Sequence, residues 1–451
     1  MENAEIIYLP YRPKAEEFFN SLRHLPDALW FDSGHPVCSS GQFDIITANP
    51  SVTLETNGKI TTKETFKCTE ELTGEPFDLC EKLLSTIQSK DKQHLEYPFT
   101  GGLAGYFGYD LGRNSTYKLP KLDTLPDMRI GLYEWALTLD HFSKKAWLFF
   151  NAKCSKKLKN KVINCLNKIT QDNDFKEKLS YHLSSSTKRS HYLDTVKKAK
   201  NYILAGDCYQ INYAQHFSAS IKEDSWKVYK DLRIRMAAPY GCYYQLGKTK
   251  KAILSFSPER FLKLKGDQVT TQPIKGTVSR GENTQEDAIK AKALIDSEKN
   301  KAENLMIVDL LRNDLSKNCR LGTVKTTELF KLESFENVHH LVSTVTGVIK
   351  DTATSLTLLR DCFPGGSITG APKKRAMEII DELEGCKRSV YCGSIGYISA
   401  NGVMDTNIAI RTLLSDGNKI HCWGGGGIVA DSDAEDEYQE ILDKVGLLLK
   451  Y

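Results

Sequence analysis

The sequence predicts an α+β fold in which sheets and helices form layers. Residues 5–150 contain short apolar or alternating runs separated by Pro and Gly, a pattern typical of strands and turns. Beyond residue 190, windows with the apolar spacing of helices alternate with further strand-like runs. No segment repeats at a fixed period, which argues against a solenoid or a propeller.

The first half of the chain is predicted to be rich in sheet. Residues 43–48 and 147–150 have the strongest strand patterns, and one helix is expected at residues 79–87. The serine-rich segment 184–190 is the best candidate for a linker, because Ser and Lys are readily left in water. Two domains are therefore predicted, covering residues 1–185 and 186–451.

The second half mixes helices and strands. The predicted helices cover residues 192–205, 225–236, 284–315, 372–383 and 434–449. The predicted strands cover residues 252–255, 269–272, 394–398 and 406–414.

Composition excludes several classes of protein. With 40% hydrophobic and 26% charged residues, the 451-residue chain is globular in composition. A formal charge of +4 is too small to indicate a nucleic-acid groove. The twelve cysteines are scattered without zinc-type spacing, which predicts reduced thiols. No secretory signal and no apolar run of about 20 residues is present, so a cytoplasmic protein without a membrane partner is expected.

Lys275 is the first candidate for chemistry, because it precedes Gly276 just after a predicted strand. The glycine would allow a ligand to approach the backbone. A single lysine is more often a solvated surface charge. To act as a nucleophile at neutral pH it must lose its proton, which costs about 4 to 5 kcal/mol from an ordinary pKa. Burial or a nearby cation would have to supply most of that cost.

Four carboxylates are candidates for acid–base or metal chemistry. Glu259 follows a proline at the end of a strand, a common position for an acid or a base, although a turn carboxylate paired with Arg260 is equally consistent. Glu303 lies in a long predicted helix, and Glu437 and Glu440 are three residues apart on the last helix. Two or three such groups would suffice for Mg²⁺, yet an ordinary charged helix face explains them as well.

Two glycine-rich segments could bind an anion. Residues 363–372 run into a helix whose free N–H groups favour negative charge, but the order of a Walker phosphate loop is absent. Residues 424–427 are four consecutive glycines after a strand, and Arg411 lies on a neighbouring predicted strand. A bidentate arginine beside backbone N–H groups could hold a carboxylate, or it could simply be exposed.

Taken together, these segments resemble the family of chorismate-utilising enzymes, which includes anthranilate, aminodeoxychorismate, isochorismate and salicylate synthases. The resemblance covers roughly residues 190–447 and implies the layered fold of anthranilate synthase component I. The matching runs are Ala302-Glu-Asn-Leu-Met-Ile-Val-Asp, Val338-His-His-Leu-Val, Gly365-Gly-Ser-Ile-Thr-Gly-Ala-Pro-Lys, Met404-Asp-Thr and Glu437-Tyr-Gln-Glu440.

Lys275 determines which reaction the resemblance implies. Pro273-Ile-Lys275 is similar to the aminodeoxychorismate synthase branch, whereas the other members carry alanine at this position. The likeness implies that the Lys275 amine attacks C2 of chorismate and expels the 4-hydroxyl, and that ammonia then adds at C4. It also implies that Glu259 is the general acid. Gln210 stands where the water-using members have a basic lysine, and its amide cannot activate water as a base.

The resemblance implies further ligands and partners. Mg²⁺ would be held by Glu303, Glu437 and Glu440. Substrate contacts would come from Gln210, His340, Ser367, Tyr391, Arg411, Gly425 and Gly427. A pocket for L-tryptophan, with a looser match in which Gln42 replaces an arginine, would be formed by Ser33, Ser40, Gly41, Gln42, Phe43, Pro239, Tyr240 and Gly241. Ammonia would come from a separate glutamine amidotransferase subunit, and the product would lead to 4-aminobenzoate and folate.

The sequence favours chorismate amination over three alternative functions. An anthranilate-forming enzyme is disfavoured by Lys275. A non-catalytic sensor of tryptophan or chorismate is disfavoured because Lys275, Glu259 and the three metal carboxylates are all retained. A nucleic-acid binder is the remotest, since it would require a steep salt dependence that the charge balance does not suggest.

Overall fold

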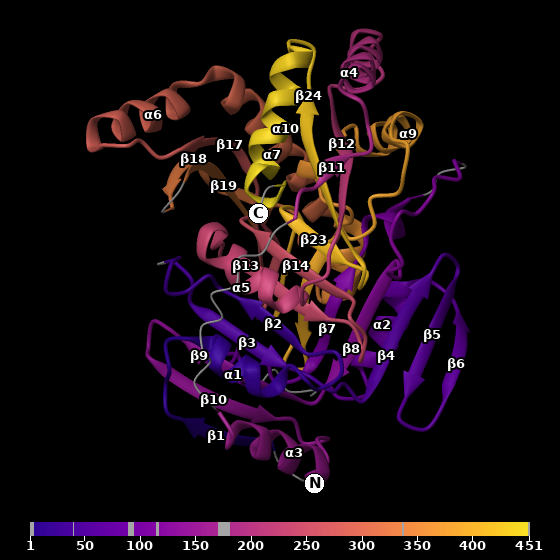
Figure 1. Ribbon diagram of the computed structural model, residues 1–451, viewed down its shortest axis with the longest axis vertical. Helices are drawn as coiled ribbons and strands as arrows, with labels where there is room; N and C mark the ends of the chain where they lie inside the picture. The colour runs from indigo at the N-terminus through magenta and orange to yellow at the C-terminus, as the bar shows by residue number, and fades with distance from the viewer. Residues whose placement is uncertain are drawn as a thin grey trace.

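The computed structural model describes residues 4–38, 40–88, 94–113, 117–169, 181–335 and 338–449. It confirms the predicted α+β class: two 12-stranded sheets, whose paired strands are antiparallel, are combined with helices. In Figure 1 the indigo and purple strands of the first half lie lowest, and the orange and yellow elements of the second half lie above them.

The first sheet takes strands from both ends of the chain. Its order is β1 (Glu5–Leu9), β10 (Lys145–Phe150), β9 (Trp135–Asp140), β3 (Phe43–Thr47), β2 (Leu29–Asp32), β13 (Tyr240–Gln245), β14 (Ala252–Ser257), β23 (Thr412–Ser415), β24 (Lys419–Ile428), β12 (Gln210–Ser220) and β11 (Ser184–Ser185), with β20 (Gly370–Ala371) beside β12.

The second sheet is equally mixed. Its order is β17 (Ile274–Ser279), β19 (Val338–Val348), β16 (Gln268–Gln272), β15 (Arg260–Lys265), β22 (Met404–Asn407), β21 (Ser394–Ser399), β7 (Gly102–Phe107), β8 (Met128–Tyr133), β4 (Val52–Asn57), β5 (Ile60–Thr65) and β6 (Thr69–Thr73), with β18 (Lys325–Ser334) beside β19.

Both sheets run across the predicted boundary near residue 185. Strand β2 pairs with β13 in one sheet, and β7 pairs with β21 in the other. Strands from both predicted domains thus share each sheet, and whether residues 1–185 and 186–451 fold independently stays a prediction. The predicted linker contains β11, and α4 begins at Arg189. Residues 170–180, just before it, lie outside the described residues.

The helices form two groups. Helices α1 (Ala15–Leu22), α3 (Lys156–Leu166), α4 (Arg189–Leu204), α5 (Ser225–Met236), α9 (Lys373–Leu383) and α10 (Ala434–Leu449) share one apolar core with the first sheet. Helices α2 (Pro76–Leu84), α7 (Glu298–Asn318) and α8 (Ser355–Cys362) join the core between the sheets, and α6 (Thr284–Asp296) projects beside β17 and β18. Short 3-10 turns cover Tyr109–Gly112 and Gly366–Ile368. No helix in the described parts is both long and apolar enough to cross a membrane.

Two predicted elements were wrong in extent. The predicted helix 284–315 is two helices, because Ser297 is extended (ψ 105°) and its side chain accepts the Asn300 N–H to start α7. The predicted strand 406–414 is two strands in different sheets, β22 and β23. The chain crosses between the sheets at residues 408–411, and Arg411 has a positive φ of 50° there. Arg411 therefore lies at the crossing and not within a strand.

Candidate active site

Lys275 lies on β17, where two features give it room and reactivity. Gly276 has φ +88°, and a Cβ there would lie 2.9 Å from Leu294 Cδ1, so the position requires glycine. Lys275 is half-buried, and burial lowers the pKa of its amine. The carboxylate of Glu303 opposes this shift, while the ammonium of Lys444 reinforces it. Burial thereby increases the fraction of the amine that is neutral and nucleophilic.

Glu259 lies in the turn between β14 and β15 and is only 5% exposed. Its Oε1 accepts a hydrogen bond of 2.6 Å from the hydroxyl of Ser367. Burial raises the pKa of Glu259 to about 7, although Ser367 and the ammonium of Lys275 act in the opposite direction. At neutral pH a large fraction of this carboxyl therefore carries a proton and can donate it.

Ser367 belongs to the loop of residues 363–372, and the residue after that loop, Lys373, anchors it to α7. Lys373, at the start of α9, donates to Asp314 Oδ2 (2.5 Å) and to the Cys362 carbonyl (2.8 Å). Asp314 lies on α7 and is 2% exposed in its side chain. This buried ion pair therefore holds the loop that carries Ser367 against the helix that carries Glu303.

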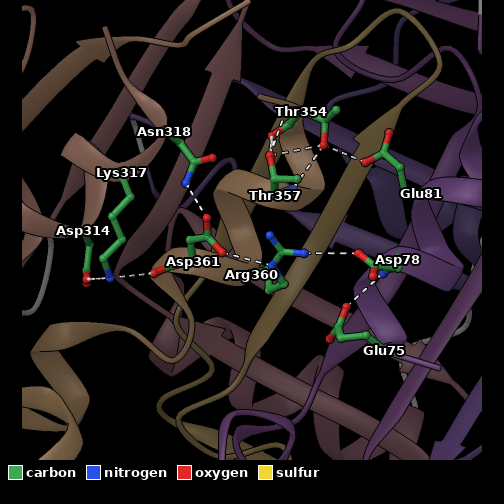
Figure 2. Close-up of polar contacts among 10 residues, drawn as sticks. All are labelled: Glu75, Asp78, Glu81, Asp314, Lys317, Asn318, Thr354, Thr357, Arg360 and Asp361. Atoms are coloured by element: carbon green, nitrogen blue, oxygen red, sulfur yellow. Dashed lines mark hydrogen bonds and ion pairs between the residues drawn. The ribbon is translucent and has the colours of Figure 1, made fainter. Parts of the chain in front are cut away.

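A set of polar contacts extends from Asp314 to α8 and α2, as Figure 2 shows. Arg360 donates to Asp361 and to Asp78 of α2, and Thr354 donates to Glu81 of α2. We call this set the helix network; it consists of Glu75, Asp78, Glu81, Asp314, Lys317, Asn318, Thr354, Thr357, Arg360 and Asp361.

The three predicted metal carboxylates surround the lysine region from two helices. Glu437 is 3% exposed and accepts a 2.7 Å hydrogen bond from Ser432; burial, together with Glu440, raises its pKa. Burial also opposes ionisation of Glu440, but its 2.6 Å pair with Lys444 prevails and lowers its pKa. Glu303, on α7, acts on the charge of Lys275.

Their fit to Mg²⁺ is partial. Carboxylate oxygens are the ligands that Mg²⁺ prefers, and Lys299 and Lys444 already place positive charge beside Glu437 and Glu440. Within the described ranges, however, no three acidic, histidine or cysteine side chains converge closely enough to form a metal cluster. The magnesium site stays a prediction.

Arg411 and His340, two of the predicted substrate residues, differ in charge. Arg411 has no ion pair with any carboxylate in the described parts of the chain, and burial lowers its pKa. His340 is 1% exposed, and its Nδ1 lies 2.8 Å from Thr277 Oγ1 on the lysine strand. Burial and the charge of Arg411 lower the pKa of His340 to about 3, so it is neutral. Arg411 thus offers an unpaired charge for an anion.

The other predicted substrate residues lie on β12, β24 and the segment after α9. Gln210 is fully buried, and its Nε2 is 2.7 Å from the point that a Cβ of Gly427 would occupy. Lys275 Nζ is 3.5 Å from the same point, which brings Gln210 and Gly427 together with the lysine. Gly425 lies two residues along β24, where a Cβ would approach the Tyr213 carbonyl to 2.8 Å. Tyr391 is buried, and its ring is stacked 6.5 Å from that of Trp423.

Sequence reasoning missed Asn212, Lys299 and Lys444. Asn212 is buried on the same face of β12 as Gln210, and strand alternation from Gln210 could have identified it. Lys444 follows Glu440 by four residues on α10, a spacing that could have suggested the pair. Nothing local singles out Lys299.

All eight residues predicted to bind tryptophan line one cavity of about 360 Å³ between the two sheets. Ile274 and Pro258, which precede Lys275 and Glu259, line the same cavity. Among the described residues the buried Ser33 hydroxyl has no hydrogen-bond partner, and Gln42 Nε2 donates to Asp140 at 3.4 Å. The cavity therefore adjoins the back of the catalytic strand; what it binds stays a prediction.

Comparisons of the sequence with known proteins identify a family and several relatives of this chain. A family model described as chorismate binding enzyme matches residues 28–450. Aminodeoxychorismate synthase component 1 of Escherichia coli (strain K12) is 42% identical over 99% of this chain and 98% of its own length. Anthranilate synthase component 1 of Acetivibrio thermocellus is 34% identical over 91% of this chain and 86% of its own.

Solved structures agree with the predicted fold type. Anthranilate synthase component I from Streptococcus pneumoniae TIGR4 superposes with a TM-score of 0.80 at 31% identity, covering 90% of this chain and 92% of that one. The isochorismate synthase MenF from Escherichia coli superposes with a TM-score of 0.74 at 17% identity, which supports the fold alone. The predicted anthranilate synthase component I type of fold is confirmed.

Proposed function

Because this chain belongs to the family of chorismate binding enzymes, we propose that it aminates chorismate at C4 to give 4-amino-4-deoxychorismate. The observation that carries the proposal is that one site holds both Lys275, whose pKa is lowered by burial, and Glu259, whose pKa is raised by burial to about 7, close enough for their charges to influence each other. A neutral amine and a protonated carboxyl on one site suit displacement of a hydroxyl group.

In the first step the Lys275 amine forms a bond to C2 of chorismate, both conjugated ring double bonds shift along the ring toward C4, and the C4–O bond breaks. Glu259 gives its proton to the departing hydroxyl, which leaves as water. The adduct then carries a secondary ammonium on C2, and Glu259 is a carboxylate. Ser367, which donates to Glu259, stabilises that carboxylate.

In the second step ammonia forms a bond to C4, both ring double bonds shift back, and the C2–N bond breaks. The electron pair of that bond returns to Lys275 as a neutral amine. The new ammonium group on C4 gives one proton to Glu259, which restores the acid. The net change is chorismate plus ammonia to 4-amino-4-deoxychorismate plus water.

Substrate binding falls to the charged and glycine-rich elements. The unpaired Arg411 would hold one carboxylate of chorismate. Glu303, Glu437 and Glu440 would hold Mg²⁺, which would supply positive charge for a second carboxylate. Neutral His340 and the backbone of Gly425 and Gly427 would complete the pocket.

Three further proposals follow from the family and from the relatives' names. The chain would receive ammonia from a separate glutamine amidotransferase subunit, as the name component 1 of the Escherichia coli relative suggests. The cavity between the sheets would bind L-tryptophan. The product would serve 4-aminobenzoate and folate synthesis in the cytoplasm.

Incubation of the purified protein with chorismate, Mg²⁺ and an ammonium salt at pH 8 tests the reaction. We expect 4-amino-4-deoxychorismate by mass, and a loss of about a thousandfold or more in Lys275→Ala. Without ammonium, intact-protein mass should reveal chorismate minus water on the wild type and none on the variant. Lys331→Ala, an exposed lysine on β18, is the matched control and should retain activity. Formation of anthranilate and pyruvate would contradict C4 amination, and binding without turnover would indicate a sensor.

A further inference from the structure

One face of β12 presents two carboxamides that the rest of the protein leaves incomplete. Gln210 is 0% exposed and Asn212 is 6% exposed. Neither the Oε1 nor the Nε2 atom of Gln210, nor the Oδ1 atom of Asn212, has a hydrogen-bond partner in the described parts of the chain. Buried polar groups are almost always satisfied, and each one left without a partner costs about 1–3 kcal/mol. Both carboxamides are therefore free to form hydrogen bonds with a small polar molecule in the site.

The orientation of the Asn212 amide is fixed. Its Nδ2 donates to the Ile368 carbonyl at 3.1 Å, in the loop that carries Ser367. Turning the amide over would place its oxygen against that carbonyl oxygen, so Oδ1 must be the atom left free. The unmet need at Asn212 is therefore for a hydrogen-bond donor.

The two amides lie over two glycines that are two residues apart on β24, the strand that runs beside β12 (Figure 1). Gln210 Nε2 lies 2.7 Å from the Cβ point of Gly427, and Asn212 Oδ1 lies 3.0 Å from that of Gly425. Lys275 Nζ is 3.5 Å from the Gly427 point. The Gln210 amide thus lies near Lys275, the Asn212 amide lies two residues along the same face of β12, and neither residue lines the cavity between the sheets.

The chemistry of this pair suits ammonia. The carboxylates of chorismate only accept hydrogen bonds, and its one hydroxyl leaves as water in the first step, whereas ammonia enters afterwards and has N–H groups to donate. A carboxylate in this position would stabilise ammonium, which has no lone pair to attack with. Neutral amide oxygens accept N–H bonds without taking the proton, so the lone pair stays available.

We propose that Asn212 positions ammonia beside Gln210: its free Oδ1 atom accepts an N–H hydrogen bond and helps to direct the nitrogen lone pair toward the substrate. This inference rests on the proposed amination. Asn212 forms no covalent bond and transfers no proton; the C4–N bond, the C2–N cleavage and the return of a proton to Glu259 proceed as described above. Asn212 is therefore needed for the ammonia step and not for formation of the lysine adduct.

The test separates these two steps in Asn212→Leu, which keeps the size and removes the acceptor. Without ammonium, adduct formation is followed by intact-protein mass after rapid mixing with chorismate and Mg²⁺. With chorismate saturating, product formation is followed against ammonium concentration. We expect adduct formation within about twofold of wild type and a KM for ammonium raised about tenfold, the effect of one lost hydrogen bond.

Asn401→Leu is the matched control, because Asn401 is also buried but bonds to the carbonyls of His94 and Tyr97 and to the Val403 N–H. It should melt at a lower temperature and keep the wild-type KM for ammonium. If Asn212→Leu does not fold, the nearly isosteric Asn212→Asp replaces it; its carboxylate should favour bound ammonium and slow product formation at saturating chorismate.

Equal loss of adduct and product, with an unchanged KM for ammonium, would overturn this positioning role and assign Asn212 to chorismate or to the fold. Absence of any adduct on the wild type would contradict the lysine step alone. The ammonium dependence of product formation would still decide the role of Asn212, because it does not require the adduct to accumulate.

Discussion

The candidate active site and the helix network are both rich in polar side chains, yet they differ in how those side chains are satisfied. In the helix network each of the ten residues has a hydrogen bond or ion pair with the protein. At the active site, within the part of the chain that the structure describes, the Gln210 amide and the Asn212 oxygen have no hydrogen-bond partner and Arg411 has no carboxylate partner. The first region is complete without a ligand, and the second is not.

Exposure sharpens the contrast. Arg360 and Asp78 of the helix network are 38% and 58% exposed in their side chains, so water could satisfy them even without each other. Gln210 and Glu259 are at most 5% exposed and have no such alternative. Buried groups without partners lower stability and await a ligand, whereas exposed pairs contribute little to either stability or chemistry. Substitutions in the two regions should therefore have opposite signatures.

The largest effect is expected from Glu259→Gln, which keeps the shape and the contact to Ser367 but removes the proton donor. Adduct formation should fall by about 10²–10⁴-fold, the usual contribution of a general acid. In the wild type the rate should also fall above about pH 7, where Glu259 loses its proton. Rapid-mixing mass measurements from pH 6 to pH 9 provide the check, and a flat profile would exclude Glu259 as the acid.

The same variant should change the pH dependence of stability. Because the pKa of Glu259 is raised from 4.5 to about 7 in the folded state, the folded protein binds the proton more tightly than the unfolded chain. Its contribution is present below pH 4.5 and is lost as pH rises to about 7, by about 3 kcal/mol. Denaturant unfolding at pH 5 and pH 8 should show this loss in the wild type and not in Glu259→Gln.

Arg411→Met should weaken binding and not the fold. Loss of one or two charge-assisted hydrogen bonds, at about 1.5–3 kcal/mol each, predicts a chorismate KM raised on the order of 100-fold. Stability should stay unchanged or rise, because the substitution removes a half-buried charge that has no carboxylate partner among the described residues.

Arg129→Met is the matched control for Arg411. Arg129 is 11% exposed in its side chain and pairs with Asp27 at 2.7 Å and with Glu55. Its loss should cost about 3–5 kcal/mol of unfolding free energy and leave the chorismate KM unchanged. Denaturant unfolding and initial rates on both variants give the comparison. Equal destabilisation of the two would mean that Arg411 has a structural role.

Local signals predicted the helices well and the sheets poorly. The ends of α5 and α10 agree with residues 225–236 and 434–449, because the caps and the apolar spacing that define them are local. Asp224, for instance, accepts the Trp226 N–H at the start of α5. The pairing of β2 with β13 joins residues about two hundred positions apart, and no local pattern encodes it.

The errors have physical causes. Residues 406–414 form a mostly buried run, so no alternation of exposed side chains marks where the chain leaves one sheet for the other. The break between α6 and α7 could have been predicted from the sequence, because Ser297 is a favourable N-cap residue for α7. The other site residues could be predicted because they lie in motifs of the family. Asn212 lies outside those motifs, and what marks it is its oxygen, which has no partner among the described residues and lies on the same face of β12 as Gln210.

The smallest effect is expected in the helix network. Arg360→Met removes contacts of 3.0 Å to Asp361 and 3.2 Å to Asp78, both partly exposed, and should cost at most about 1 kcal/mol of unfolding free energy. Lys373→Met, on the edge of the same network, leaves the buried Asp314 with Lys317 as its remaining ion pair and should cost about 3 kcal/mol or more. Because Lys373 also holds the loop that carries Ser367, this variant alone should slow adduct formation. Denaturant unfolding and adduct rates of both variants decide the matter: if Arg360→Met slowed adduct formation as much as Lys373→Met does, the helix network would be part of the catalytic apparatus and the contrast between the two regions would fail.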